Sequence, residues 1–442
     1  RVLARYAHDQ LQDRRYHASP ALVLFPVHTD EVLEIVRLCA EHRVPLTPRG
    51  GGSGLTGGAI PVAGGVVLSL DRMNRIVEVD QENLCATVEA GVVTKDLDAH
   101  LEPLGLFFPG YPMSEEICNI GGNVAENAGG GRAIKYGVTG THVLGLEVVT
   151  ATGELLRLGG KRLKDVSGYS LIPLFVGSEG TLGIVTRVTL RLSPRPPVRR
   201  GLLVSFASAE RAAEAIGVVR RQGPSAVEYI DGETARRTAS SGARTETRVP
   251  GESEALLLVE FDGQEERDVV RPLAAAREAL SGCGGTVLVA AETDADLEKL
   301  WALRKAVPWY IKRTAGELHS LEDVVVPPAE IPGMVAASRR LAREHGLDVA
   351  VFGHGADGNF HVTPLAPEGM SEALWYERSE AYLADLYRYV VANGGAISGE
   401  HGIGRKRVHA LRDVTGTAEL AMMRRLKETL DPQGILNPGV VL

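Results

Sequence analysis

Cysteine is scarce in this sequence of 442 residues, and the few that occur are poorly placed for joint chemistry. The four cysteines, Cys39, Cys85, Cys118 and Cys283, are far apart in the chain, and none forms a Cys-x-x-Cys pair. This spacing argues against an iron–sulfur cluster held by the chain and against a disulfide scaffold. We therefore expect a reducing, cytoplasmic setting.

Long apolar runs and basic tracts are also absent. No apolar run approaches the ~18–20 residues that span a bilayer, so we expect no transmembrane segment, although attachment at a membrane surface stays open. The net charge is −8, and Arg405-Lys406-Arg407 is too short a basic cluster to indicate nucleic acid as a partner. The chain starts at Arg1 rather than at methionine, so a targeting segment ahead of it also stays open.

What the sequence has in quantity is glycine, with 51 residues that gather in loops 50–58, 121–131 and 177–183. Glycine lets a backbone approach a phosphate or a flat cofactor where a Cβ atom would obstruct it. Three such segments in one region favour a long, extended cofactor.

The first glycine loop contains the letters of a dinucleotide-binding fingerprint but lacks its context. The pattern Gly-x-Gly-x-x-Gly occupies Gly52, Gly54 and Gly57, and the fingerprint must open a helix. Pro61 and the surrounding glycines prevent a helix here. What remains is a nest of successive N–H groups beside Arg49, which can converge on an anion such as a pyrophosphate. The alternative is a mobile surface loop.

A break separates two patterns of secondary structure. Three prolines in residues 193–197 predict a stiff linker. Before it we expect short strands and a helix over 29–43, capped by Thr29 or Asp30. After it, strand–helix–strand units predict an α+β layer of strands backed by helices. The expected strands before the break are 44–48, 66–70, 76–79, 86–90, 144–150 and 183–192, and the expected helices after it are 208–221, 264–281, 329–345, 371–392 and 417–430.

Two histidines mark the second half of the chain, in the segment His354-Gly-Ala-Asp-Gly-Asn-Phe-His361. The Asp-Gly dipeptide favours a two-residue type I′ turn, which would pair the two histidines directly on one face, with Cβ atoms ~4.5–5.5 Å apart. Glu400 and His401 follow about forty residues later. Two histidines and a glutamate would leave a bound metal an open position, as in catalytic zinc sites. The alternative is a pair of structural histidines.

Five motifs, taken in order along the chain, resemble one family. They are Pro-Arg-Gly-Gly-Gly-Ser-Gly-Leu (48–55), Ile-Gly-Gly-Asn-Val-Ala-Glu-Asn-Ala-Gly-Gly (120–130), Val-Gly-Ser-Glu-Gly-Thr-Leu-Gly-Ile (176–184), the histidine segment (354–361) and Ser-Gly-Glu-His-Gly-Ile-Gly (398–404). Their combination is similar to the vanillyl-alcohol-oxidase-type, or PCMH-type, FAD proteins. Within these it resembles the FAD-linked 2-hydroxy-acid oxidoreductases, which include the glycolate oxidase D subunit, D-lactate dehydrogenases and D-2-hydroxyglutarate dehydrogenases.

The resemblance implies an α+β fold in three parts. Residues 1–196 would form a PCMH-type FAD-binding domain of two subdomains, residues 197–395 a ferredoxin-like α+β substrate domain that carries the hairpin, and residues 396–442 a helical segment that returns to the FAD domain. Ser53 stands where relatives with covalent FAD carry a histidine, so we expect non-covalent FAD. The residues implied to bind FAD are Arg49, Gly50, Gly51, Gly52, Ser53, Gly54, Leu55, Pro109, Gly121, Gly122, Ala128, Gly180, Gly183, Ile184 and Asn437.

The implied reaction is the oxidation of a D-2-hydroxy acid, of the D-lactate or glycolate type, to a 2-oxo acid with hydride transfer to flavin N5. His354, His361 and Glu400 would hold a divalent metal, with zinc as the first expectation. His401 would take the hydroxyl proton. Arg304 would hold the substrate carboxylate, and its alternative is a solvated arginine on a helix face.

The sequence departs from the family pattern at two places. Pro109-Gly110-Tyr111-Pro112 replaces the usual Pro-x-Asp-Pro, which puts the flavin environment there in doubt. His361-Val362-Thr363 replaces His-x-Asn. Thr363 would lie on the same strand face as His361, so it is a candidate substrate contact.

The electrons must leave through an acceptor outside the chain. An iron–sulfur subunit, an electron-transfer flavoprotein, a cytochrome, a quinone or oxygen would serve, and dehydrogenase behaviour is expected over oxidase behaviour. Whether the protein is a homodimer stays open.

One alternative substrate is D-2-hydroxyglutarate, whose second carboxylate would need Lys312, Arg313 or Arg405. Alternatives of other classes are a zinc hydrolase on the same ligands and redox-neutral FAD use, as in alkylglycerone-phosphate synthases.

Overall fold

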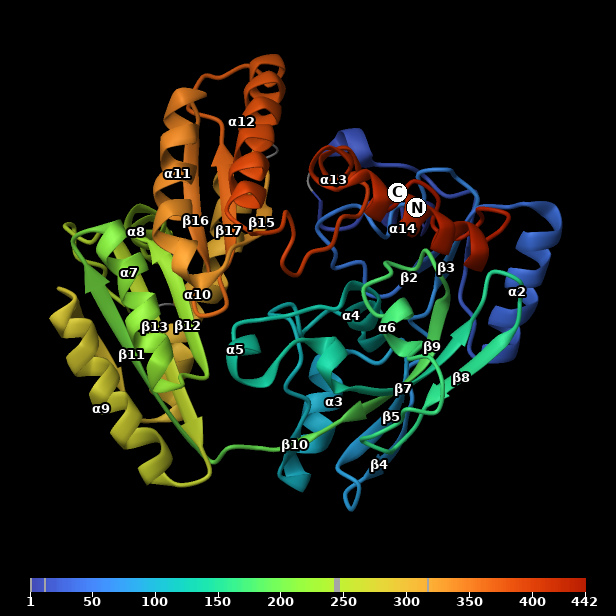
Figure 1. Cartoon of the computed structure of the whole chain (residues 1–442), viewed down its shortest axis with the longest axis horizontal. Helices are drawn as coiled ribbons and strands as arrows, with labels where there is room; N and C mark the ends of the chain where they lie inside the picture. Colours follow the sequence, from blue (N-terminus) through green and yellow to red (C-terminus); the bar gives the residue numbers. More distant parts are fainter. Residues whose placement is uncertain (1, 12, 242–246, 316–317) are drawn as a thin grey trace. The chain divides into compact units, whose positions relative to one another are not determined.

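The computed structural model describes residues 2–11, 13–241, 247–315 and 318–442, and the chain forms two compact units (Figure 1). Unit 1 contains Arg1–Gly130, Gly137–Arg195 and Glu400–Leu442, and unit 2 contains Gly131–Tyr136 and Pro196–Gly399. The excursion of residues 131–136 into unit 2 is a feature that no sequence pattern had indicated.

Unit 1 begins with a small parallel sheet in the strand order β1-β3-β2. Strand β1 (Leu22–Leu24) leads into helix α2 (Thr29–His42), whose apolar stripe of Val32, Val36 and Cys39 is buried, and the chain returns as β2 (Leu46–Arg49) beside β3 (Val66–Ser69). The helix over 29–43 is therefore confirmed. Its predicted cap is wrong, because His28 occupies the N-cap position and the Thr29 hydroxyl donates instead to Glu147, 2.7 Å away.

The larger sheet of unit 1 is antiparallel, in the order β4-β5-β9-β7-β8. Val88, Leu146 and Val188 belong to its buried core. The strands are β4 (Ile76–Asp80), β5 (Cys85–Glu89), β7 (Val143–Val149), β8 (Leu155–Gly159) and β9 (Ile184–Arg191), with β6 (Leu106–Phe107) and β10 (Ser193–Pro194) paired separately. The helices are α1 (Val2–Arg5), α3 (Thr94–Leu101), α4 (Ile120–Glu126), α6 (Ile172–Phe175), α13 (Val408–Val414) and α14 (Thr417–Leu430).

The end of the chain returns to this unit through backbone pairing. The Leu46 N–H donates to Ile435 O, and the Asn437 N–H donates to Leu46 O, both at 2.8 Å. Leu46 opens the strand that leads into the first glycine loop, so the C-terminal residues lie against the start of that loop.

Unit 2 is built on a seven-stranded antiparallel sheet in the order β14-β11-β13-β12-β16-β17-β15. The first four strands follow a β-α-β-β-α-β path with spatial order 4-1-3-2, which is the ferredoxin-like arrangement expected for this domain. The strands are β11 (Val198–Phe206), β12 (Ala226–Asp231), β13 (Ala255–Gly263), β14 (Thr286–Ala291), β15 (Glu322–Val325), β16 (Asp348–His354) and β17 (Asn359–Leu365). Its helices are α5 (Ala133–Tyr136), α7 (Ala209–Val219), α8 (Gly232–Ser240), α9 (Glu266–Gly282), α10 (Asp294–Thr314), α11 (Ile331–Glu344) and α12 (Glu372–Ala392).

The two faces of this sheet differ in chemistry. Helix α9 packs on the face of Phe261 and Gly263, where Val269 approaches the Gly263 backbone. Helix α10 lies on the opposite face, where its Trp301 donates to Glu260 at 2.5 Å. One face is therefore an apolar core beneath helices, and the other carries buried carboxylates.

Glu260 organises one half of the polar face. Its side chain is fully buried, and Arg132 (3.0 Å) and Arg199 (3.2 Å) pair with it. Burial alone would raise the pKa of Glu260, but the two guanidinium groups outweigh burial and leave the pKa lowered. Next along β13, Asp262 accepts from Lys135 and Tyr136. These bonds hold the excursion of residues 131–136 on the sheet.

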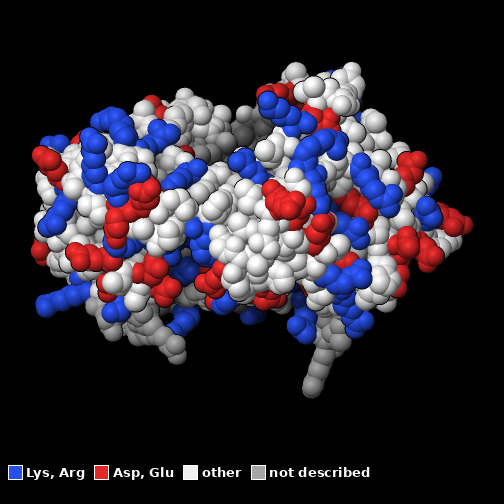
Figure 2. Space-filling view, turned by 90° about the horizontal axis from the view of Figure 1, so that it is seen from below, with Lys and Arg blue, Asp and Glu red and all other residues white. Residues whose placement is uncertain are grey.

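Within the part of the chain that is described, no helix has the length and apolar content needed to cross a bilayer. Over the face drawn in Figure 2, lysines and arginines are interspersed with aspartates and glutamates.

Replacing Glu260 with glutamine should lower the free energy of unfolding by about 2–3 kcal/mol. Breaking a buried ion pair leaves uncompensated charge and typically costs ~3–5 kcal/mol, and the partial exposure of both arginines, 22% and 24%, reduces that figure. Urea denaturation followed by circular dichroism measures the change. The control is Glu266→Gln, which removes an exposed partner of Arg200 and should cost under ~1 kcal/mol; equal losses in both variants would contradict the role of Glu260.

Candidate functional site

The loop after β2 presents a run of peptide N–H groups without partners. Among the described residues, none of the backbone N–H groups of residues 51–56 donates a hydrogen bond to the chain. The next one, of Gly57, donates to Asp9 Oδ2 at 2.9 Å. Peptide groups in folded proteins are nearly always paired, so six successive donors are suited to an anionic ligand. The nest expected from the sequence is therefore present as a backbone feature.

Two glycines make this backbone path possible. A Cβ atom on Gly51 would lie 2.0 Å from Ile117 O, and Gly52 has φ +65°, where other residues are strained. Beside Gly51 lies a cavity of about 250 Å³ in unit 1. It is lined by Gly51, Asp71, Asn74, Ile76, Gly91, Val92, Val93, Asp96, Ile117 and Asn119.

Arg49 faces the loop from inside. Its guanidinium donates to the carbonyl oxygens of His8 (2.8 Å) and Ala59 (3.2 Å) and lies over the Tyr6 ring. A Cβ atom on Gly52 would meet this guanidinium at 2.1 Å. The side chain thus shapes the loop, whereas the sequence had suggested only that it joins the loop in holding a pyrophosphate.

The other residues expected at the cofactor divide into two groups. A Cβ atom on Gly50 would lie 3.7 Å from Gly122 Cα, and Gly180, with φ +69°, packs on Pro48, so these lie at the loop. Gly121 packs on Ala90, and Gly183 packs on Val148 and Phe175. Three further residues are buried, namely Pro109, Ala128 and Ile184. This second group supports the surrounding strands and turns.

Asn437 closes the loop from the C-terminal segment. Its Nδ2 donates to Gly58 O and to Glu179 O, both at 2.8 Å. Its buried Oδ1 has no hydrogen-bond partner among the described residues. The side chain therefore clamps the end of the glycine loop and retains one free acceptor.

The histidine hairpin of unit 2 has a different register from the predicted one. His354 pairs with Asn359, and His361 pairs with Phe352, so the two histidines are diagonal rather than opposite. The connection is the four-residue turn 355–358, because the Gly355 N–H donates to Val227 O of β12 and not across the hairpin. The predicted two-residue turn is wrong. Both histidines still share one face, with ring centroids 5.5 Å apart.

A buried charge cluster holds His354. Glu228 of β12 accepts from His354 Nδ1 at 2.7 Å and from Arg304 Nε at 2.6 Å. All three side chains are buried, so Arg304 is not a solvated helix-face residue. Burial alone would raise the pKa of Glu228, but His354 and Arg304 outweigh it and leave the pKa lowered. Arg304 Nη2 is buried with no hydrogen-bond partner among the described residues.

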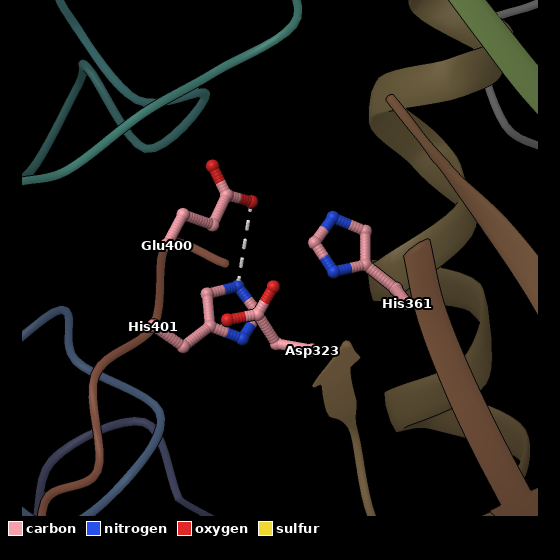
Figure 3. Close-up of side chains that lie close together, drawn as sticks. All are labelled: Asp323, His361, Glu400 and His401. Carbon is pink, nitrogen blue, oxygen red and sulfur yellow. Dashed lines mark ion pairs between the residues drawn. The ribbon is translucent and has the colours of Figure 1, made fainter. Parts of the chain in front are cut away.

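Asp323 is a candidate ligand that the sequence analysis missed (Figure 3). It pairs with His361 across β15 and β17, and its carboxylate accepts from Asn359 Nδ2 (2.6 Å), Ser398 Oγ (2.8 Å) and the Gly399 N–H (2.9 Å). The only signal in the sequence is a pair of acids at the start of an apolar strand, Glu322-Asp323, which no spacing rule singles out.

Glu400 and His401 belong to unit 1 and lie directly beyond this anchor in the chain. Glu400 Oε1 is 3.6 Å from His401 Nε2, drawn as the dashed line in Figure 3. Consecutive Cα atoms are ~3.8 Å apart. The Gly399 N–H is bonded to Asp323 at the start of β15, so Glu400 follows directly on a residue that is anchored there.

Thr363 lies on the same strand face as His361, as expected. Its side chain is fully buried, and its hydroxyl oxygen has no hydrogen-bond partner among the described residues. A buried hydroxyl without a partner is costly, so a polar ligand at this face would stabilise it.

Nitrogen and oxygen donors at the histidine hairpin suit a divalent transition metal such as zinc. Unpaired peptide N–H groups and close-approach glycines in unit 1 suit a diphosphate. These features suit a phosphate-bearing cofactor in unit 1 and a metal-chelating ligand at the hairpin of unit 2.

Comparison with known proteins gives the class and then the family. Residues 20–159 match the family described as "FAD binding domain", and residues 195–441 match "FAD linked oxidases, C-terminal domain". The chain therefore belongs to the FAD-linked oxidases, and it is an FAD-linked oxidoreductase. The family expected from the five motifs is confirmed.

Two curated relatives align over nearly the whole chain. The chain is 39% identical to "Glycolate oxidase subunit GlcD" of Bacillus subtilis (strain 168), over 96% of this chain and 89% of that protein. It is 35% identical to "D-lactate dehydrogenase" of Anaerostipes hadrus, over 96% and 90%. The structure of p-cresol methylhydroxylase with substrate bound superposes with a TM-score of 0.80 at 19% identity, covering 99% of this chain and 92% of that one, which shows the shared fold.

Replacing Gly51 with alanine should strongly weaken FAD binding, because the new Cβ atom would lie 2.0 Å from the Ile117 carbonyl oxygen and force the nest to move. Quenching of FAD fluorescence on titration into apoprotein measures the affinity, and we expect a loss above about 100-fold, or ~2.7 kcal/mol. Gly217→Ala in α7 is the control, since nothing lies within 4 Å of its Cβ position and its φ is not in the left-handed region. Undiminished FAD affinity in the Gly51 variant would contradict the role of the loop.

Proposed function

We propose that this protein oxidises a D-2-hydroxy acid of the glycolate or D-lactate type to the 2-oxo acid with non-covalent FAD. The observation that carries the proposal is the state of the buried Arg304 guanidinium. Its Nε donates to Glu228, and its Nη2 has no hydrogen-bond partner among the described residues. Such a donor is suited to a substrate carboxylate. The names of the two curated relatives, a glycolate oxidase subunit and a D-lactate dehydrogenase, support the same substrate class.

FAD would be held by the loop of Arg49 to Leu55 and by Asn437, and a divalent metal, zinc first, by His354, His361 and Glu400. Asp323 is a further oxygen donor, opposite His361 on the neighbouring strand, whereas His354 is not among the side chains that the structure groups with these two. When bound, FAD supplies a two-electron acceptor and the metal supplies Lewis-acid polarisation of a hydroxyl group. The bond from Nδ1 of His354 to the Glu228 carboxylate fixes the orientation of that ring.

The residues of the chain would then divide the work on the substrate. Arg304 binds the carboxylate and orients the α-carbon, while the Thr363 hydroxyl contacts a polar group of the substrate. His401 takes the proton from the α-hydroxyl, because imidazole is the side chain best suited to exchange protons near neutral pH. Burial of Arg304 and Thr363 excludes water from the carboxylate, which strengthens the charge interaction.

A monocarboxylate fits this arrangement better than D-2-hydroxyglutarate. A second carboxylate would need another cation beside Arg304. Lys312 lies eight residues further along α10, which is about 12 Å at 1.5 Å per residue. Arg313 is exposed, and the backbone of Arg405 is held at Thr56 of the glycine loop. We therefore place D-2-hydroxyglutarate second, and membership of the FAD-linked oxidases removes the zinc hydrolase alternative.

Electrons would leave to an acceptor outside the chain. All four cysteines are free, and three of them, Cys39, Cys85 and Cys118, are buried at separate places in the sequence. We propose a protein or quinone acceptor, such as an iron–sulfur subunit, an electron-transfer flavoprotein or a cytochrome.

Replacing His401 with asparagine should lower kcat by about 10²–10⁴-fold, the usual contribution of a general base, while FAD stays bound. Stopped-flow reduction of the bound flavin by D-lactate or glycolate measures the step, and the flavin absorbance of the purified variant checks occupancy. His345→Asn is the control, because that histidine bonds Asp385 at the end of α11. Near-normal flavin reduction in the His401 variant would overturn the base assignment.

A further inference from the structure

The segment after His401 is irregular, yet its backbone N–H groups are hydrogen-bonded to two other residues of unit 1. Four successive N–H groups donate to only two residues. Those of Ile403 and Gly404 donate to the Glu179 carboxylate at 2.8 and 2.7 Å. Those of Arg405 and Lys406 donate to the Thr56 carbonyl at 2.9 and 3.0 Å. The placement of this segment therefore depends on Thr56 and Glu179.

Thr56 is the last residue of the unpartnered N–H run. It is fully buried, and its hydroxyl donates to His401 O at 3.2 Å. A Cβ atom on Gly404, where φ is +56°, would lie 2.2 Å from Thr56 O. The close approach fixes the segment on the loop, and a ligand that orders residues 51–56 must also order Thr56.

Glu179 holds the same segment from the other side. It is buried in a left-handed conformation with φ +51°, and its backbone N–H and C=O are bound to Ala125 and Asn437. Burial raises the pKa of its carboxyl to about 7, against the lowering effect of the Ile403 and Gly404 N–H groups and of Arg407. A strained, buried carboxylate that accepts two backbone donors is an anchor for the backbone that it binds.

The turn between His401 and these anchors is tightly packed. Gly402 has φ +77°, and a Cβ atom there would lie 2.3 Å from Glu126 Oε2 and 2.9 Å from the Glu179 carboxyl. Arg407 Nη1 donates to Gly402 O at 2.8 Å. His401 is thus joined to the anchors by a turn with little room to adjust.

We infer that Thr56 and Glu179 are positioning residues that couple occupancy of the glycine loop to the placement of His401. Filling the loop fixes Thr56, which fixes the amides of Arg405 and Lys406, and Glu179 carries the constraint to Ile403 and Gly404. The proton-accepting histidine is then held more tightly in the cofactor-loaded protein than in the apoprotein. This inference rests on the proposed function, in which the loop binds FAD and His401 is the base.

Hydrogen–deuterium exchange tests the coupling without relying on turnover. The exchange of the amides of residues 403–406 is measured in the apoprotein and the FAD-loaded protein by mass spectrometry with residue-level fragmentation. We expect FAD to slow these amides by on the order of tenfold more than those of β7, because coupling energies between sites are commonly 5–150-fold. Equal slowing of β7 and residues 403–406 would overturn the inference.

Two variants separate the anchors. Glu179→Gln should bind FAD and lose most of the FAD-dependent protection at residues 403 and 404. Asp231→Asn is the matched control. Asp231 is a buried carboxylate of unit 2 that also accepts two backbone N–H groups, and its replacement should leave protection at 403–406 unchanged.

If Glu179→Gln does not fold, Thr56→Val should retain FAD and lower kcat by about tenfold with little change in KM, and Thr56→Ser should restore kcat. A Thr56→Val enzyme with normal kcat would overturn the inference.

The outcome also distinguishes this inference from the proposed function. A protein that binds FAD and reduces it with a hydroxy acid, but shows no specific slowing at residues 403–406, retains the proposed function and loses the coupling. A protein whose FAD is not reduced by any hydroxy acid, but which shows the slowing, loses the proposed substrate class and retains the coupling of the loop to the segment.

Discussion

The structure depends on a stretch of backbone that the chain cannot satisfy by itself. The six N–H groups of residues 51–56 have no acceptor among the described residues, although unpaired peptide groups are costly. Much of unit 1 serves to hold them in that state. Asp9 fixes Gly57, Arg49 fills the inside of the loop, and Asn437 closes its end. A loop held so firmly in an unsatisfied shape is preorganised for an anion, and this accounts for the concentration of glycine in the sequence.

In unit 2 the corresponding constraint is the burial of charged side chains. Glu228 and Glu260 are completely buried on one face of the sheet, and each is compensated by cationic or N–H donors. At Glu228 the ion pair with Arg304 leaves the Nη2 group of that arginine without a hydrogen-bond partner among the described residues. A fold that only needed stability would gain little from such a cluster, since buried ion pairs rarely outperform apolar packing. Binding of a substrate carboxylate, as we propose, would account for the cluster.

Local patterns in the sequence were sufficient for much of the fold. The helices over 371–392 and 417–430 follow their periodicity closely, as α12 and α14 show, and so do the expected strands 66–70, 86–90 and 183–192 of unit 1. The bounds of α10 were not predicted, although a helix at Arg304 was considered. The hairpin register was wrong because the Gly355 N–H is bound by β12, a strand more than a hundred residues earlier in the chain. Turn rules consider only the two strands they join.

The site residues divide in the same way. Those carried by a motif, such as His361, Glu400 and the glycine loop, could be named from the sequence. Asp323 and the anchoring role of Glu179 could not, because each acts through partners distant in sequence: Asp323 through Ser398 and Gly399, and Glu179 through Ile403 and Gly404. The resemblance supplied Arg304 as a carboxylate ligand, but only the structure shows the Glu228 partner that holds it buried.

The most direct test of the account is an anaerobic titration of the FAD-loaded protein with single 2-hydroxy acids, followed by flavin absorbance and by assay of the 2-oxo product. The account predicts that D-lactate or glycolate bleaches the flavin with one 2-oxo acid formed per FAD, and that L-lactate reduces it at least about 100-fold more slowly, a difference of ~2.7 kcal/mol in transition-state energy. A flavin that remains oxidised with every D-2-hydroxy acid, or that is reduced without formation of a 2-oxo acid, would contradict it.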